Sequence, residues 1–285
     1  MLGRIIGLLA LAAALSACSA VKLGYNNLGE VAYWWLDGYV EFSDEQAARV
    51  REDLARLHLW HRSHELPRLV EMLRRMEDLA PGDISPAQAC MFVEQVRDRL
   101  DAMAERAETA AITLAMGLAP EQLGHLERKY ARNNAEYRKK WISPGATEVA
   151  ENRFKQFLGR SETIYGDLGD AQRAVLRRQI QQSIFDGPRL LAERMRRQRD
   201  ALQTLRKLIG EPVSSDEART LLRGYLARTR EPPEAAQRQY QHALIDEGCR
   251  VFAALHNSTN VEQRQSAVRR LRAYQRDLRE LAAQK

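Results

Sequence analysis

Apolar residues recur at three- and four-residue steps through most of the chain after Phe42, and this spacing places them on one face of an α-helix. No alternating run rich in Val, Ile and Thr indicates a strand. Clear examples of the helical spacing are Val50, Leu54 and Leu57, then Val93, Val96, Leu100 and Met103, and then Leu271, Tyr274, Leu278 and Leu281. The sequence therefore predicts an all-α protein.

Proline and glycine divide this helical pattern into segments of ordinary length. Such segments leave about ten helices with short connections, and short connections favour antiparallel neighbours. We expect a multi-helix bundle or a stack of helical hairpins. The breaks fall at Pro81-Gly82, Pro144-Gly145, Gly187-Pro188, Gly210-Glu211-Pro212 and Pro232-Pro233.

Six helix starts share one pattern, in which Gln or Glu stands three residues after a capping position. In such a capping box the cap side chain accepts a bond from a free backbone N–H, and the Gln or Glu accepts one from the N–H of the cap residue. Ala119 and Gly169 occupy two of the capping positions, and neither has a side chain that could accept a bond. The six segments are Phe42–Gln46, Ile84–Gln88, Leu118–Gln122, Leu168–Gln172 and the looser copies Val213–Glu217 and Thr259–Gln263.

The six starts recur every 34 to 50 residues. This spacing is compatible with a structural repeat of helical hairpins. The alternative is that good helix starts converge on one chemistry. We favour convergence, because the sequences that follow the starts differ.

Residues 1–17 resemble a secretory signal, in which Arg4 precedes an apolar run from Ile5 to Leu15. The run is shorter than the ~20 apolar residues of a transmembrane helix. At its end, Leu15-Ser16-Ala17-Cys18 resembles the bacterial lipobox, which implies a lipoprotein whose Cys18 is acylated, palmitate included, and becomes the new N-terminus. The alternative is an ordinary secretory signal with a chance cysteine at this position.

The lipobox resemblance also implies a compartment. Several acyl chains on one residue give stable anchoring, so a membrane is the first expected partner. Ser19 follows the cysteine, where an Asp would suggest retention in the inner membrane. We therefore expect an outer-membrane anchor that faces the periplasm, with a lipidated tether over residues 18–28 and a helical periplasmic domain over residues 29–285.

An aromatic cluster, Tyr33-Trp34-Trp35 with Tyr39, follows the expected tether. Beside a lipid anchor such residues could lie at the headgroup boundary, where Trp and Tyr are enriched. Clusters of this kind pack more often into the core of the protein itself, and core packing is the expectation here.

The formal net charge of +6 becomes about +5 after removal of Arg4, the only charged residue of the signal. A positive balance can indicate a nucleic-acid partner, but the expected compartment argues against one. Arginine pairs such as Arg74-Arg75 and Arg196-Arg197 are interleaved with acidic residues, as on exposed helix faces. We expect a surface of mixed charge and no nucleic-acid partner.

Two cysteines remain after lipidation, Cys90 and Cys249. An oxidising periplasm permits a disulfide between them. Such a bridge would close a loop of about 160 residues and constrain the unfolded chain. Two separate buried thiols are the alternative, and the sequence leaves both open.

The segment from Trp60 to Pro67, with the sequence WHRSHELP, is the one stretch with possible chemistry. On a helix, His61 and Glu65 lie one turn apart and face the same way. Together, with or without His58 or His64, they could hold zinc or another divalent ion.

A structural role for the same segment is the interpretation that we favour. Pro67 removes a helix hydrogen bond and kinks the axis. Arg62 and Glu65 would then pair across three residues. The bend would be packed by Trp60 and Leu66, with a hydrogen-bonded, partly buried His61 beside them.

The lipobox, the W-H-R-x-x-E-L-P segment and the L-x-x-x-Q helix starts together resemble a proteobacterial family of helical lipoproteins of unassigned function. The resemblance extends over most of the mature chain and implies an outer-membrane-type lipoprotein with a domain of unknown function. The helix starts alone resemble the L-T-x-x-Q signature of small periplasmic proteins of the Spy type, which implies a chaperone-like or envelope-stress role.

The sequence has no Gly-rich phosphate loop, no H-E-x-x-H and no G-x-S-x-G. We expect a non-enzymatic binding or scaffold module of the cell envelope, with an unidentified envelope protein as partner and no cofactor. A chaperone-like or metal-responsive stress protein is the first alternative, and a cell-wall enzyme is the second.

Overall fold

The computed structural model describes residues 21–210 and 213–284. Within these ranges the chain is almost wholly helical and forms no strand, so the predicted all-α class is confirmed. A short helical stretch, residues 21–26, comes first. It is followed by α2 (Leu28–Val40), α3 (Asp44–Trp60), the π-helical segment η1 (His61–Glu65), α4 (Leu66–Leu79), α5 (Pro86–Met116), α6 (Pro120–Trp141), α7 (Ala146–Tyr165), α8 (Asp170–Gln181), α9 (Gly187–Gly210), α10 (Ser215–Arg230), α11 (Ala235–Asn257) and α12 (Val261–Ala283).

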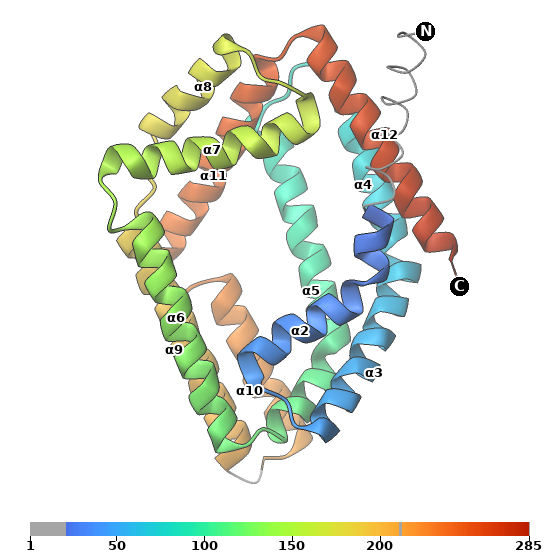
Figure 1. Cartoon of the computed structure of the whole chain (residues 1–285), viewed down its shortest axis with the longest axis vertical. Coiled ribbons are helices and arrows are strands. Elements are labelled where there is room, and N and C mark those ends of the chain that lie inside the picture. Colours follow the sequence, from blue (N-terminus) through green and yellow to red (C-terminus); the bar gives the residue numbers. More distant parts are fainter. Residues whose placement is uncertain (1–20, 211–212, 285) are drawn as a thin grey trace, which may run out of the picture.

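The helices are arranged in pairs around an open frame (Figure 1). The most extensive pairs are α4 with α12 and α5 with α11, followed equally by α2 with α3 and α6 with α9. α2 packs against both α3 and α6 and crosses the frame between them, and α7 contacts α8 and α12. The arrangement therefore combines a helical bundle with stacked hairpins.

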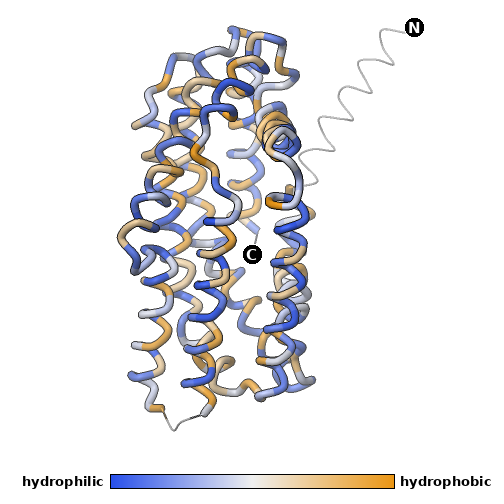
Figure 2. Tube along the Cα trace, turned by 90° about the vertical axis from the view of Figure 1, so that its left-hand side faces the viewer, coloured by the Kyte–Doolittle hydropathy of each residue, from blue (hydrophilic) through white to orange (hydrophobic). Residues whose placement is uncertain are grey.

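The core is divided into several small clusters, as expected for a frame of paired helices. One cluster joins α7, α8 and α11 through Phe154, Leu176 and Val251. Another joins α2 to α3 through Tyr33 and Val50. Hydrophilic and hydrophobic residues are interleaved along the described helices (Figure 2), because each helix buries only one face.

The predicted capping chemistry is present at the helix starts. Complete capping boxes form at the caps Ser43, Ser85, Ser214 and Asn260. At the other two starts only half of the box forms, because Ala119 and Gly169 have no capping side chain. Their backbone N–H groups donate to Gln122 and Gln172, at 2.8 and 2.9 Å.

Two of these glutamines also join helix starts that lie far apart in sequence. The side-chain amide of Gln46, at the start of α3, donates to the carbonyl of Gly117 before α6, at 2.7 Å. Gln122, at the start of α6, donates in return to the carbonyl of Glu41 before α3, at 3.0 Å. We call this reciprocal pair the first glutamine bridge.

The same arrangement recurs between α8 and α12. Gln172 donates to the carbonyl of Ser258 before α12, at 2.9 Å. Gln263 donates to the carbonyl of Asp167 before α8, also at 2.9 Å. This second glutamine bridge gives the shared helix-start pattern a structural role in addition to capping.

Candidate functional site

The Trp60–Pro67 segment forms a π-helical turn within a long helix. α3 ends at Trp60, and the N–H of Leu66 at the start of α4 donates to the carbonyl of His61, five residues earlier. Pro67 cannot donate a backbone bond, and the wider turn before it accommodates the missing one. Because π-turns inside α-helices are frequent at functional sites, this segment is the first candidate site.

Glu65 is the buried centre of this turn, with 1% of its surface exposed. Its two carboxylate oxygens face Arg68 at 3.2 Å and Arg99 at 3.6 Å. The predicted pair with Arg62 is wrong, because Arg62 instead donates to the side-chain oxygen of Asn26 at 2.9 Å. The positive charges beside Glu65 come from Arg68, three residues later, and from Arg99 on α5.

The geometry gives the metal alternative little support. Within residues 21–210 and 213–284, no three His, Cys, Asp or Glu side chains are grouped to hold a metal ion. Glu65 lies between two guanidinium groups, which repel a cation at the same place. His61 directs its Nδ1 toward Tyr25 instead.

The first described residues of the chain are docked on this segment. Residues 21–26, within the predicted tether of residues 18–28, are helical. The hydroxyl of Tyr25 lies 3.0 Å from Nδ1 of His61, and its ring lies 4.6 Å from the ring of His58, centroid to centroid. The guanidinium of Arg62 lies 5.6 Å from the centre of the same tyrosine ring. The Trp60–Pro67 segment, together with His58, therefore forms the surface on which the N-terminal helix packs.

Ion pairs on the neighbouring helix complete this docking. Lys22 pairs with Asp277 at 3.7 Å and with Glu280, both on α12. Burial raises the pKa of Asp277, which Lys22 opposes. Burial lowers the pKa of His58 and of His61, so both rings are neutral at neutral pH. The N-terminal helix is thus held by α12 through charge and by α3 and η1 through uncharged rings.

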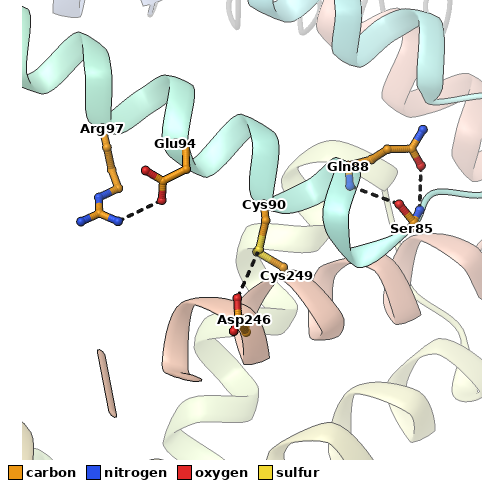
Figure 3. The surroundings of a disulfide bond; sticks show 7 residues. All are labelled: Ser85, Gln88, Cys90, Glu94, Arg97, Asp246 and Cys249. Atoms are coloured by element: carbon orange, nitrogen blue, oxygen red, sulfur yellow. Dashed lines mark hydrogen bonds and ion pairs between the residues drawn. A yellow bond between two sulfur atoms is a disulfide. The ribbon is translucent and has the colours of Figure 1, made fainter. Parts of the chain in front are cut away.

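A disulfide joins α5 to α11. Cys90 and Cys249 are bonded, with their Cα atoms 5.4 Å apart (Figure 3). Of the two alternatives that the sequence left open, the structure has the bridge. A carboxylate oxygen of Asp246 lies 3.9 Å from the sulfur of Cys90. The bond connects residues that are 159 positions apart.

An apolar groove of about 620 Å³ lies beside the disulfide and is lined by residues of α4, α5, α7, α11 and α12. Pockets of a few hundred cubic ångströms with mostly apolar walls are typical ligand sites. Val93, Val96 and Phe252 remain partly exposed on its wall. The wall also includes Leu79, Phe92 and Leu271.

The sequence did not indicate this groove. The spacing of Val93, Val96 and Leu100 identifies one apolar face of a helix, and such a face is normally buried. In the structure Leu100 is 58% exposed and the two valines are also open to solvent. Helical periodicity reveals an apolar face but not what covers it.

His256 lines the groove but is not available for proton transfer. Its Nε2 donates to the carbonyl of Gly82 at 2.8 Å, so its Nδ1 accepts from the hydroxyl of Tyr165 at 2.9 Å. Burial lowers the pKa of His256 and raises the pKa of Tyr165 to about 12. Both groups are neutral and already bonded within the protein.

The aromatic cluster of α2 is divided between core and surface. Tyr33 is buried against Ala47 and Val50, as expected. The expectation of core packing is wrong for Trp34 and Trp35, which are 64% and 62% exposed. Two tryptophans on the surface of one short helix form the third candidate site.

The predicted signal and Cys18 lie outside the residues that the structure describes. Among the helices within the described ranges, none has the length and apolar character needed to cross a bilayer.

The chain matches a known family model. The model of a family described as "Family of unknown function (DUF6279)" matches residues 38–223. This range includes the Trp60–Pro67 segment and Cys90, and it ends before Cys249. No curated protein and no solved structure gives a significant match.

Proposed function

Because this chain belongs to the DUF6279 family of unknown function, we propose a role for it from its own geometry: a membrane-anchored, non-enzymatic binding module of the cell envelope. The apolar groove between α5 and α11 is the observation that supports binding. The lipobox-like sequence that ends at Cys18 supports an acyl anchor in the outer membrane, facing the periplasm. Such a module would hold a partner near the membrane.

The shape of the apolar surface favours an apolar segment of another polypeptide as the ligand. Val93 and Val96 line the groove, and Leu100 continues the same face of α5 for another turn. An elongated apolar surface on a helix matches the way in which amphipathic helices bind in grooves, with anchors three and four residues apart. The partner would therefore present an apolar stripe of about two turns.

A chaperone-like role is the second proposal, and the same groove supports it. Met76 lines the groove and Met91 is exposed nearby on α5. Methionine side chains adapt to differently shaped ligands, which suits a site that binds many unfolded clients. For a cell-wall enzyme the groove offers less, because none of the described residues that line it is acidic.

Photo-crosslinking in cells tests the binding proposal. A photoreactive residue at Val96 in the groove is compared with one at Gln156, an exposed position on α7. One recurrent protein captured from Val96 and not from Gln156 would support a dedicated partner. Many proteins, increasing after unfolding stress, would favour the chaperone role. Equal capture from both positions, or none, would contradict binding in the groove.

The anchor is tested separately with Cys18→Ser. We expect this variant to lose palmitate labelling and to leave the membrane fraction. Unchanged fractionation of the variant would contradict the proposed lipid anchor.

A further inference from the structure

One face of α2 is an exposed apolar stripe, formed by Leu28, Val31, Trp34 and Trp35. Successive residues of an α-helix are about 100° apart, so these positions lie within an arc of about 120°. All four side chains are between 45% and 64% exposed. An amphipathic helix normally buries such a face.

The opposite face of α2 is already occupied. Tyr33 is buried against α3, and the guanidinium of Arg51 lies 3.6 Å from the centre of its ring. At the C-terminal end of α2, Tyr39 lies at the edge of the stripe itself and contacts Tyr130 on α6, at 6.2 Å between ring centroids. Rotation of α2 to bury the stripe would therefore break its packing on two neighbouring helices.

The stripe also lies close to the proposed anchor. The first described residue of the docked N-terminal helix is Val21, only three positions after Cys18. Three residues span at most ~11 Å, even when fully extended. An acyl chain on Cys18 would therefore hold the bilayer surface next to the helix that leads directly into α2. Leu23, on that helix, is 68% exposed as well.

We infer that the α2 stripe inserts into the headgroup region of the membrane to which the protein is anchored. This inference rests on the proposed lipid anchor. Tryptophan is the side chain most typical of that region, because its indole is both large and amphipathic. Glu30, at the edge of the stripe, is 3.9 Å from Arg51, which offsets its charge. The occupant of the stripe is thus a lipid surface, which the anchor supplies to every molecule.

The stripe would give the anchored protein a fixed orientation. A lipid on a free tether permits the body to rotate, whereas two contacts with the same membrane restrict it. The N-terminal helix transmits this constraint, because Tyr25 and Lys22 bind it to η1 and α12.

Fluorescence quenching in vesicles tests this inference. The full-length, lipidated protein is reconstituted into vesicles of phosphatidylethanolamine and phosphatidylglycerol, with a nitroxide near the top of some acyl chains. The variant Trp60→Phe/Trp141→Phe retains only Trp34 and Trp35 of the four tryptophans. We expect its emission to shift to the blue and to lose at least half of its intensity to the quencher.

The matched control is Trp34→Phe/Trp35→Phe, which retains only Trp60 and Trp141. We expect its emission to be unaffected by the quencher. Because Trp60 lies beside the π-turn and its replacement could disturb folding, a second probe leaves all tryptophans in place. This probe is a polarity-sensitive dye on Val31→Cys, and its emission should also shift to the blue on vesicles.

Mass spectrometry of the N-terminus separates the possible failures. An acylated protein that sediments with vesicles while Trp34, Trp35 and the Val31→Cys dye stay in water would overturn the inference and leave the anchor intact. A protein that carries no acyl group in its native membrane would overturn both.

Discussion

The two glutamine bridges use the same bonds in different surroundings. Each joins two helix starts through reciprocal side-chain to carbonyl bonds. In the first, Gln46 and Gln122 are partly exposed and also bond each other at 2.7 Å. In the second, Gln172 and Gln263 are each only 8% exposed. The same sequence signature can therefore contribute different amounts to the stability of the fold, depending on how deeply the glutamines are buried.

Water explains the difference. If an exposed glutamine is removed, water can bond to the carbonyl that it leaves. A buried carbonyl has no such replacement, and an unsatisfied buried group costs about 1–3 kcal/mol. The second bridge should therefore contribute more to stability than the first.

Loss of the disulfide should have the largest effect. It joins α5, which ends just before Gly117 of the first bridge, to α11, which ends just before Ser258 of the second. The loop-entropy relation gives about 5 kcal/mol for a loop of this length. Urea unfolding with and without reductant measures it, and Cys90→Ala/Cys249→Ala should not respond to reductant. Equal midpoints of the wild type under both conditions would contradict the prediction.

The next effect concerns the buried bridge. Gln263→Ala leaves the carbonyl of Asp167 and the N–H of Asn260 without their partners. We expect the free energy of unfolding to fall by about 2–3 kcal/mol, against about 1 kcal/mol for Gln46→Ala at the first bridge. Urea denaturation measures both. Equal losses at the two positions would show that burial does not separate the bridges.

The caps of the first bridge provide a smaller and reciprocal test. Ser43 caps α3, whereas Ala119 occupies the same place before α6 with a similar extended backbone. Ser43→Ala should lower the free energy of unfolding by about 1 kcal/mol, and Ala119→Ser should raise it by a similar or smaller amount. Thermal and urea unfolding of both variants check the prediction. It is wrong if Ala119→Ser destabilises the protein.

Acidification should have the smallest effect, a loss of folding stability that arises near the second bridge. His256 lies two residues before Ser258, which this bridge holds, and burial lowers its pKa from the ordinary 6.5. As pH falls below 6.5, the unfolded chain binds a proton that the folded protein resists, so stability is lost toward the lower folded pKa. His58 and His61 contribute in the same direction.

Urea titrations between pH 7.5 and 5 measure this dependence. The slope of stability against pH should be smaller in His256→Gln than in the wild type. A wild type whose stability does not fall over this interval would contradict the lowered pKa.

Local signals made most of the fold predictable. The period of the apolar residues gave the helices, and the glycines, prolines and capping residues gave their ends, because each depends on neighbours in sequence. The partners across the fold were not predictable. Nothing near Gln122 indicates the carbonyl of Glu41, and nothing near Glu65 indicates Arg99.

The candidate sites were predictable only in part. The Trp60–Pro67 segment stood out by composition, but its role in docking Tyr25 depends on a contact across 36 residues. The groove and the α2 stripe could not be inferred, because an exposed apolar face has the same periodicity as a buried one. The possible pairing of Cys90 with Cys249 required only a count of cysteines.

The π-turn at His61–Glu65 has a consequence for how one long helix serves two neighbours. It adds one residue to a helical turn, and one residue corresponds to a rotation of about 100°. α3 faces α2 and α5, whereas α4 faces α12. The extra residue therefore rotates the packing face of α4 relative to that of α3 within one continuous helix. Deletion of a single residue there would remove this rotation. Either α3 or α4 would then turn the wrong face toward its neighbouring helices.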